Sequence, residues 1–128
     1  MVPQIINEWI NEGIELNPPA SEDQIIQCEN KIQFSFPEDF KRFYRICNGF
    51  KDWVMDSKLL SLWSLERIVL DYPGSNFIPF SDFLINSNQI GFSKIQKGVV
   101  RDYAENNFIC DTFEQFINHW MIESGEYM

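Results

Sequence analysis

The stretch from Phe34 to Phe50, FSFPEDFKRFYRICNGF, constrains the fold more than any other part of the sequence. Pro37 has the φ angle of a first helical turn, and the two acidic residues after it suit the positive end of a helix dipole. Aromatic side chains and a cysteine then recur at helical spacing, and Asn48-Gly49 can adopt the left-handed conformation that ends a helix. The stretch therefore predicts a short helix with both ends marked and one face that another layer must cover.

Two further helices are predicted on the N-terminal side of this stretch. In VPQIINEWINEG the apolar residues recur three and four positions apart, and Gly13 lies where such a helix would end. Asn17 to Ala20, NPPA, break the pattern. Ser21 and Gln24 then have the spacing of a capping box, which predicts that a second helix begins at this point.

After residue 50 the pattern changes to short apolar runs between turn residues, which predicts strands. The runs are WVMD, KLLSLWS, NFIPFSDFL, QIGFSK and GVVRDYA. Ser64 is expected to cap a short helix, LERIVLDY, among them. The final run, FICDTFEQFINHWMIES, predicts a closing helix with Asp111 and Glu114 as its capping pair.

This order of elements predicts the α+β class, with residues 1–128 as one domain. We expect a single twisted sheet, mixed or antiparallel, with N-terminal helices and a C-terminal helix packed against it. The 12 Phe, 4 Tyr and 4 Trp residues are many for a chain of 128 residues. We therefore expect some of the rings to line a surface groove or an interface.

The charge balance points to the kind of partner. The chain has 19 acidic and 10 basic residues, a net charge of −9. This balance argues against a nucleic acid or an anionic membrane as partner, because both attract clustered Lys and Arg. It favours a basic protein surface. The acidic residues are concentrated toward the two ends of the chain.

The candidate binding residues follow from this distribution. They are Glu8, Glu12, Glu15, Glu22 and Asp23 near the N-terminus, and Trp53, which follows Lys51 and Asp52 at a predicted turn. Acidic runs are most often a solvated helix face, and a tryptophan is most often part of the core, so both alternatives stay open.

The sequence contains little that could support catalysis. It has one histidine, His119, and three widely spaced cysteines, Cys28, Cys47 and Cys110, which we expect to be free thiols. No spacing of a zinc site, a phosphate loop or a catalytic triad occurs. Two of four carboxylates could meet in space, although the four have no spacing signature: Asp71, Asp82, Asp102 and Asp111. We therefore expect no catalytic residue, no metal and no cofactor, and a protein that is not an enzyme.

The N-terminal residues lack the basic and apolar regions of a signal peptide, and no run approaches the length of a membrane span. We therefore expect a cytoplasmic protein.

From Ser21 to Gly49 the sequence resembles the SUKH superfamily of fungal cell-wall-assembly regulators and bacterial immunity proteins. Its motifs occur here in the order typical of that superfamily. They are Ser21, Ile25 and Glu29 in a first helix, Phe36 to Phe40 (FPEDF), Asn48-Gly49, Ser64 to Ile68 (SLERI), Phe77 to Phe80 (FIPF) and Cys110 to Ile117 (CDTFEQFI). One departure is the loop expected at Ser81 to Phe92, which replaces a Gly-Asp-rich turn.

The resemblance implies an α+β fold with a mixed sheet and a function without catalysis. In bacteria it implies a cytoplasmic immunity protein that binds and blocks a cognate toxin, often a nuclease. The fungal relatives imply an alternative, a regulatory or scaffolding protein-interaction module. The motif residues Glu29, Pro37, Asn48 and Gly49 are expected to be structural. We hypothesise that Glu29 accepts hydrogen bonds from backbone N–H groups near a helix end or the Asn-Gly turn.

Overall fold

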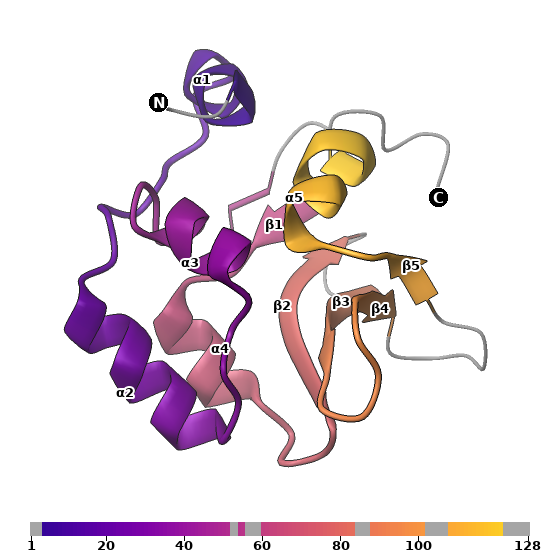
Figure 1. Ribbon diagram of the computed structural model, residues 1–128. Helices are drawn as coiled ribbons and strands as arrows, with labels where there is room; N and C mark the ends of the chain where they lie inside the picture. The colour runs from indigo at the N-terminus through magenta and orange to yellow at the C-terminus, as the bar shows by residue number, and fades with distance from the viewer. Residues whose placement is uncertain (1–3, 52–53, 56–59, 84–87, 102–107, 122–128) are drawn as a thin grey trace.

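The computed structural model describes residues 4–51, 54–55, 60–83, 88–101 and 108–121, and Figure 1 shows how its elements are arranged. The helices are α1 (Gln4–Asn11), α2 (Glu22–Ile32), α3 (Glu38–Tyr44), α4 (Leu65–Asp71) and α5 (Phe113–Gln115), which continues as the π-helix η1 (Phe116–Met121). The strands are β1 (Leu60–Leu62), β2 (Phe77–Phe83), β3 (Asn88–Ser93), β4 (Val99–Arg101) and β5 (Phe108–Cys110).

The five strands form one antiparallel sheet in the order β1-β2-β3-β4-β5. The predicted α+β class is therefore confirmed, and of the two sheet types expected the antiparallel one is present. Most of the expected loop at Ser81 to Phe92 belongs to the paired strands β2 and β3, with Ile78 opposite Phe92. Only its tip, residues 84–87, lies outside the described residues.

The predicted caps of α2 and α4 are confirmed. The Ser21 hydroxyl accepts from the Gln24 N–H, and the Gln24 side chain accepts from the Ser21 N–H, so both halves of the capping box are present. The Ser64 hydroxyl accepts from the Arg67 N–H at the start of α4. These local hydrogen bonds satisfy N–H groups that a helix cannot pair internally.

The predicted end of α3 is wrong. The helix stops at Tyr44, and Asn48-Gly49 follow beyond its last turn. The carbonyl oxygen of Tyr44 accepts the N–H of Ala20 at 2.9 Å. In a longer helix this oxygen would accept an N–H from the next turn of the same helix. Pro37 is the residue before the helix, as its missing N–H permits.

The prediction for the start of the closing helix is also wrong. Phe108–Cys110 form strand β5 beside β4, and the helix begins only at Phe113. Its capping box consists of Thr112 and Gln115 in place of Asp111 and Glu114. The predicted WVMD strand is not found at residues 54–55, and its first and last residues, Trp53 and Asp56, lie outside the described ones.

The core is built from aromatic rings contributed by both layers. Phe40 of α3 lies 5.9 Å from Phe80 of β2, 5.5 Å from Phe92 of β3 and 4.9 Å from Phe113 of α5, measured between ring centroids. Helices α3 and α5 therefore cover the same face of the sheet (Figure 1). Most described rings are buried, and Phe108 alone among them is exposed. Phe34 is half-buried and lines a groove at the surface, so few of the described rings lie at the surface. Aromatic packing of this kind supplies much of the apolar burial in a small domain.

Candidate protein-binding surface

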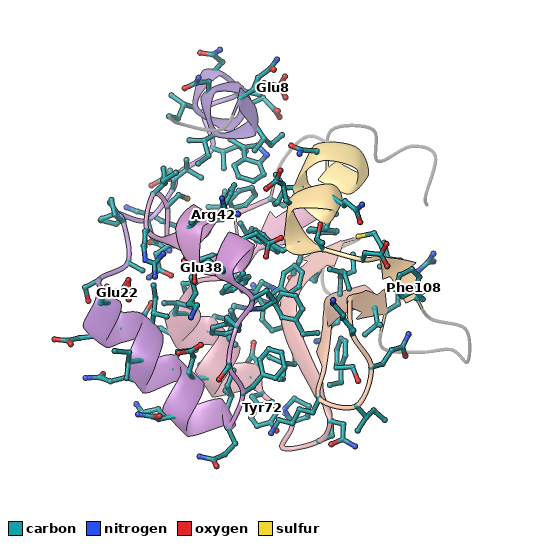
Figure 2. All side chains as sticks on the ribbon, viewed as in Figure 1. Glu8, Glu22, Glu38, Arg42, Tyr72 and Phe108 are labelled. Carbon is teal, nitrogen blue, oxygen red and sulfur yellow. The ribbon has the colours of Figure 1, made fainter. Side chains whose placement is uncertain are left out.

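The predicted acidic residues fall into two groups on the helical side of the molecule. Glu8 lies on α1, and Glu12 and Glu15 follow it in the chain; we call these three the α1 acidic group. Glu22 and Asp23 lie in the first turn of α2. Figure 2 shows Glu8 and Glu22 well apart, so the structure does not bring all five into one patch. Trp53 lies outside the described residues.

Several of these carboxylates already have cationic neighbours. Glu15 lies 3.4 Å from the Lys51 Nζ, and Glu22 hydrogen-bonds Arg45, which also binds Glu38 at 3.0 Å. The hydrogen bond from Arg45 lowers the pKa of Glu38, and the bonds to Glu22 and Glu38 raise the pKa of Arg45. Ion pairs at exposed sites contribute little stability, but they reduce the negative potential near α2.

The Asn48-Gly49 turn joins three segments that are distant in sequence. The Asn48 side chain accepts the Leu65 N–H at 2.8 Å and donates to the Glu66 carboxylate at 3.0 Å, which fixes the start of α4. The main-chain carbonyl oxygen of Asn48 accepts a hydrogen bond from the side-chain amide of Asn17 at 3.0 Å. Asn48 is 5% exposed. Because the Asn48 side chain is removed from water, its hydrogen bond to the buried Leu65 N–H is costly to break.

Gly49 has a φ of +72° and packs tightly against the main chain of Trp63, the residue that follows β1. A Cβ atom built on it would lie 2.4 Å from the carbonyl oxygen of Trp63. Both the conformation and the space therefore require glycine at this position.

Glu29 lies near the beginning of α3, seven residues before Phe36. Its Oε2 accepts the Phe36 N–H at 2.7 Å and lies 3.9 Å from the Lys41 Nζ. We hypothesised an acceptor for backbone N–H groups near a helix end, and the geometry suits that role. Together with the Asn48-Gly49 turn, this contact holds α2, α3 and α4 in one arrangement.

A buried charged cluster was missed by the sequence reasoning. Arg67 of α4 lies 3.4 Å from Asp82 of β2 and 3.2 Å from Asp71, and its guanidinium lies 4.1 Å above the Trp63 ring. The Trp63 indole N–H also donates to Asp82. Two of the four carboxylates considered for catalysis thus meet around one arginine, which forms an ion pair with each of them. No local spacing in the sequence indicates a contact between α4 and β2.

The three cysteines are free thiols whose environments suppress ionisation. Burial raises the pKa of Cys28 to about 12 and the pKa values of Cys47 and Cys110 to about 11. Thiolates are the reactive form of cysteine, so these positions are poor nucleophiles at neutral pH.

Among the residues that the structure describes, no group of three or more His, Cys, Asp or Glu side chains is placed to hold a metal ion. The described helices also include none that is long and apolar enough to cross a membrane.

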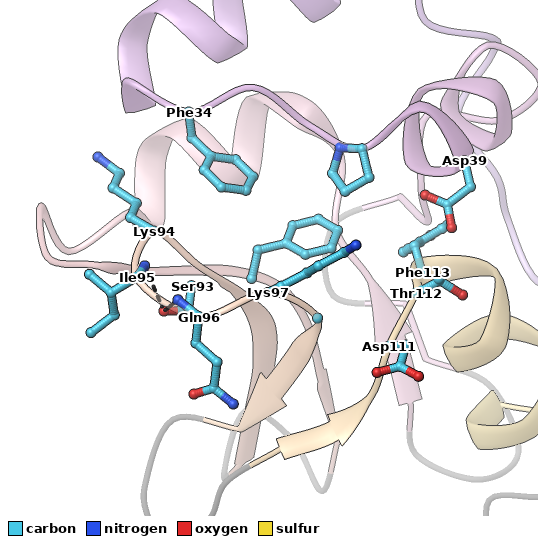
Figure 3. A pocket seen from close by; sticks show the side chains of 13 residues that line it. Phe34, Asp39, Ser93, Lys94, Ile95, Gln96, Lys97, Asp111, Thr112 and Phe113 are labelled. Atoms are coloured by element: carbon cyan, nitrogen blue, oxygen red, sulfur yellow. Dashed lines mark hydrogen bonds between the residues drawn. The ribbon is translucent and has the colours of Figure 1, made fainter.

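A groove lies where the β3–β4 turn faces the starts of α3 and α5 (Figure 3). Its volume is about 490 Å³, and its apolar lining includes Phe34, Pro37, Phe92 and Phe113. The turn contributes Lys94, Ile95 and Lys97 to one wall. We call this the turn groove. No residue of the turn was among the predicted binding residues.

Comparison with known proteins identifies the family. No curated protein sequence matches the chain. The sequence model of the SMI1 / KNR4 family (SUKH-1) matches residues 19–119, which begin between α1 and α2 and end in η1. The SUKH family includes both immunity proteins and SMI1/KNR4-like regulators, and its members are generally non-catalytic. Because the match covers most of the sequence and its motif residues build the contacts described above, the chain belongs to the SMI1 / KNR4 family (SUKH-1).

Proposed function

We propose that this protein is a cytoplasmic immunity protein that binds a basic toxin domain and blocks it without catalysis. The observation that carries the proposal is membership of a family that includes immunity proteins, combined with a net charge of −9. Many toxins that act on nucleic acids need a basic substrate groove, because they must bind phosphates. An acidic protein that covers such a groove excludes the substrate.

In the proposed mechanism the α1 acidic group draws the toxin in. Glu12 and Glu15 are exposed and Glu8 is half-buried, so their negative potential reaches the solvent. Complementary charge accelerates the encounter of two proteins, whereas lasting affinity comes from close packing of apolar groups. We therefore expect the acidic residues to govern mainly the association rate and its dependence on salt.

The test is co-expression with the toxin domain encoded beside this chain's gene, followed by binding measurements on the purified pair. The wild-type chain should rescue growth and form a 1:1 complex. The Glu8→Gln, Glu12→Gln, Glu15→Gln triple variant should associate about tenfold more slowly at low salt, with a smaller difference at high salt.

A matched control is the Glu22→Gln, Asp23→Asn variant at the start of α2, where Arg45 already offsets part of the charge. Equal association rates for the triple variant and the wild type would show that the α1 acidic group is not the steering surface. Failure of the chain to bind any neighbouring toxin, together with a stable complex with a host protein, would favour the regulatory or scaffolding alternative.

A further inference from the structure

The turn groove has the properties of a docking site for an extended chain segment. Phe34 and Phe92 stack within it, with ring centroids 5.7 Å apart, and Phe34 is only half-buried although most rings of the protein are buried. At its rim, Ile95 is 80% exposed. A partner that covered this apolar surface would gain from removing it from water.

The charges around the groove select the chemistry of the partner. The Lys94 Nζ lies 5.1 Å from the centre of the Tyr72 ring, which gives that cation a neighbour. Lys97 is exposed, and its side chain reaches from the turn toward the groove (Figure 3). Within the described residues no carboxylate lies within ion-pairing distance of it. Lys97 is therefore available to an external anion.

The two carboxylates that line the groove, Asp39 and Asp111, differ in how they would act on a bound anion. Asp39 accepts the N–H groups of Phe40 and Glu114, each at 2.9 Å, so its two oxygens are committed to the starts of α3 and α5. Asp111 is exposed on the wall away from the turn. A carboxylate bound in the groove is thus attracted at Lys97 and repelled at Asp111, which fixes its direction.

We propose that the turn groove binds an extended segment of the partner protein in which an apolar side chain stands next to an acidic one. The apolar side chain lies against Phe34 and Ile95, and the acidic side chain pairs with Lys97. This inference rests on the proposed function for its biological context, because it names a second contact with the same partner. The protein as a whole attracts that partner through its net negative charge, and Lys97 adds a local positive charge that binds an acidic side chain of the same partner.

The test uses a phage-displayed library of random seven-residue peptides selected on the full-length protein, with enriched sequences then synthesised and titrated by fluorescence anisotropy. We expect enrichment of Asp or Glu beside Leu, Ile, Phe or Trp. Lys97→Glu and Ile95→Asp should each weaken the binding of the selected peptides at least about tenfold. Replacing the acidic residue of the peptide by lysine should restore binding to Lys97→Glu and abolish it for the wild type.

Matched variants separate the groove from general effects. Lys31→Glu changes an exposed lysine on α2, and Leu70→Asp changes a side chain on α4 that is 82% exposed; both should leave peptide affinity unchanged. Circular dichroism and thermal melting should show that Ile95→Asp folds normally, since Ile95 is solvent-exposed.

Three results would overturn the proposal: no enriched sequence, enriched peptides that bind both groove variants as well as the wild type, or dimerisation through the groove that Ile95→Asp abolishes. The last result, detected by analytical ultracentrifugation, would identify a second copy of the chain as the occupant. Because the peptides are tested without the toxin, failure here leaves the immunity function standing. Peptide binding without toxin rescue would refute the immunity function alone.

Discussion

The Asn48-Gly49 turn and the α1 acidic group differ in almost every physical respect. The turn is buried, and its polar groups are hydrogen-bonded to segments that are far away in sequence. The acidic group lies at the surface before residue 19, where the match to the family begins. The motif residues of the family thus hold the fold together, whereas the α1 acidic group lies outside the matched part. Such a division allows the partner to change while the framework is retained.

The largest expected effect is at the buried turn. Gly49→Ala should lower the free energy of unfolding by about 3 kcal/mol or more, because the added Cβ meets the Trp63 carbonyl oxygen at 2.4 Å and φ is +72°. Gly74→Ala is the control: φ is +81°, but nothing lies within 4 Å of the added atom. It should cost about 1 kcal/mol. Urea denaturation measures both, and equal losses would show that close packing at the turn is unimportant.

A smaller loss is expected at Glu29. Glu29→Gln removes the negative charge from the acceptor of the Phe36 N–H and from the neighbourhood of Lys41. We expect unfolding free energy to fall by about 1 kcal/mol, since a charge-assisted hydrogen bond becomes a neutral one. Glu8→Gln on α1 is the matched change and should have almost no effect. A Glu29→Gln protein as stable as the wild type would remove Glu29 from the structural framework.

The α1 acidic group should contribute little to stability even if it governs binding. The triple change of Glu8, Glu12 and Glu15 to Gln is expected to alter the free energy of unfolding by less than about 0.5 kcal/mol, because the lost Glu15–Lys51 pair is exposed. The same urea titration checks this value. A loss comparable to that of Gly49→Ala would mean that the comparison between framework and surface is wrong.

The smallest effect concerns the exposed pair of Arg45 and Glu38. Arg45→Met should raise the pKa of Glu38 toward its ordinary value, because the hydrogen bond that lowers it is lost. A carboxylate whose pKa is depressed in the folded state stabilises the protein above its unfolded pKa, and that contribution disappears as the pH falls through the folded pKa. The wild type and the variant should therefore converge in stability under acidic conditions. NMR titration of the Glu38 carboxyl measures the shift, and Lys51→Met should leave it unchanged.

The elements that were predicted correctly depend on neighbours within one helical turn. Ser21 and Ser64 cap α2 and α4 as their spacing indicates, because a capping hydroxyl needs only an N–H two or three residues ahead. The errors occur where distant groups compete. The Tyr44 carbonyl oxygen at the end of α3 accepts the Ala20 N–H. Phe108–Cys110 pair with β4, and the capping box that follows lies at Thr112 and Gln115, one residue later than predicted.

The candidate surfaces show the same limit. The acidic residues near the N-terminus were evident from composition, but their separation into two groups depends on where α1 and α2 lie. The turn groove was not predicted, since it joins residues from the β3–β4 turn to residues at the starts of α3 and α5. No pattern along the chain relates those three segments.

The sequence by itself determined the α+β class, the net negative charge and the starts of α2 and α4, because these follow from composition and from spacings of a few residues; its motifs also indicated the family. Only the tertiary structure decided the antiparallel strand order, the use of Asn48 to hold α4, the burial of Arg67 with Asp82, and the groove beside Lys97. These features depend on which distant segments share one hydrophobic core, and the side chains that meet there are chosen by packing in three dimensions.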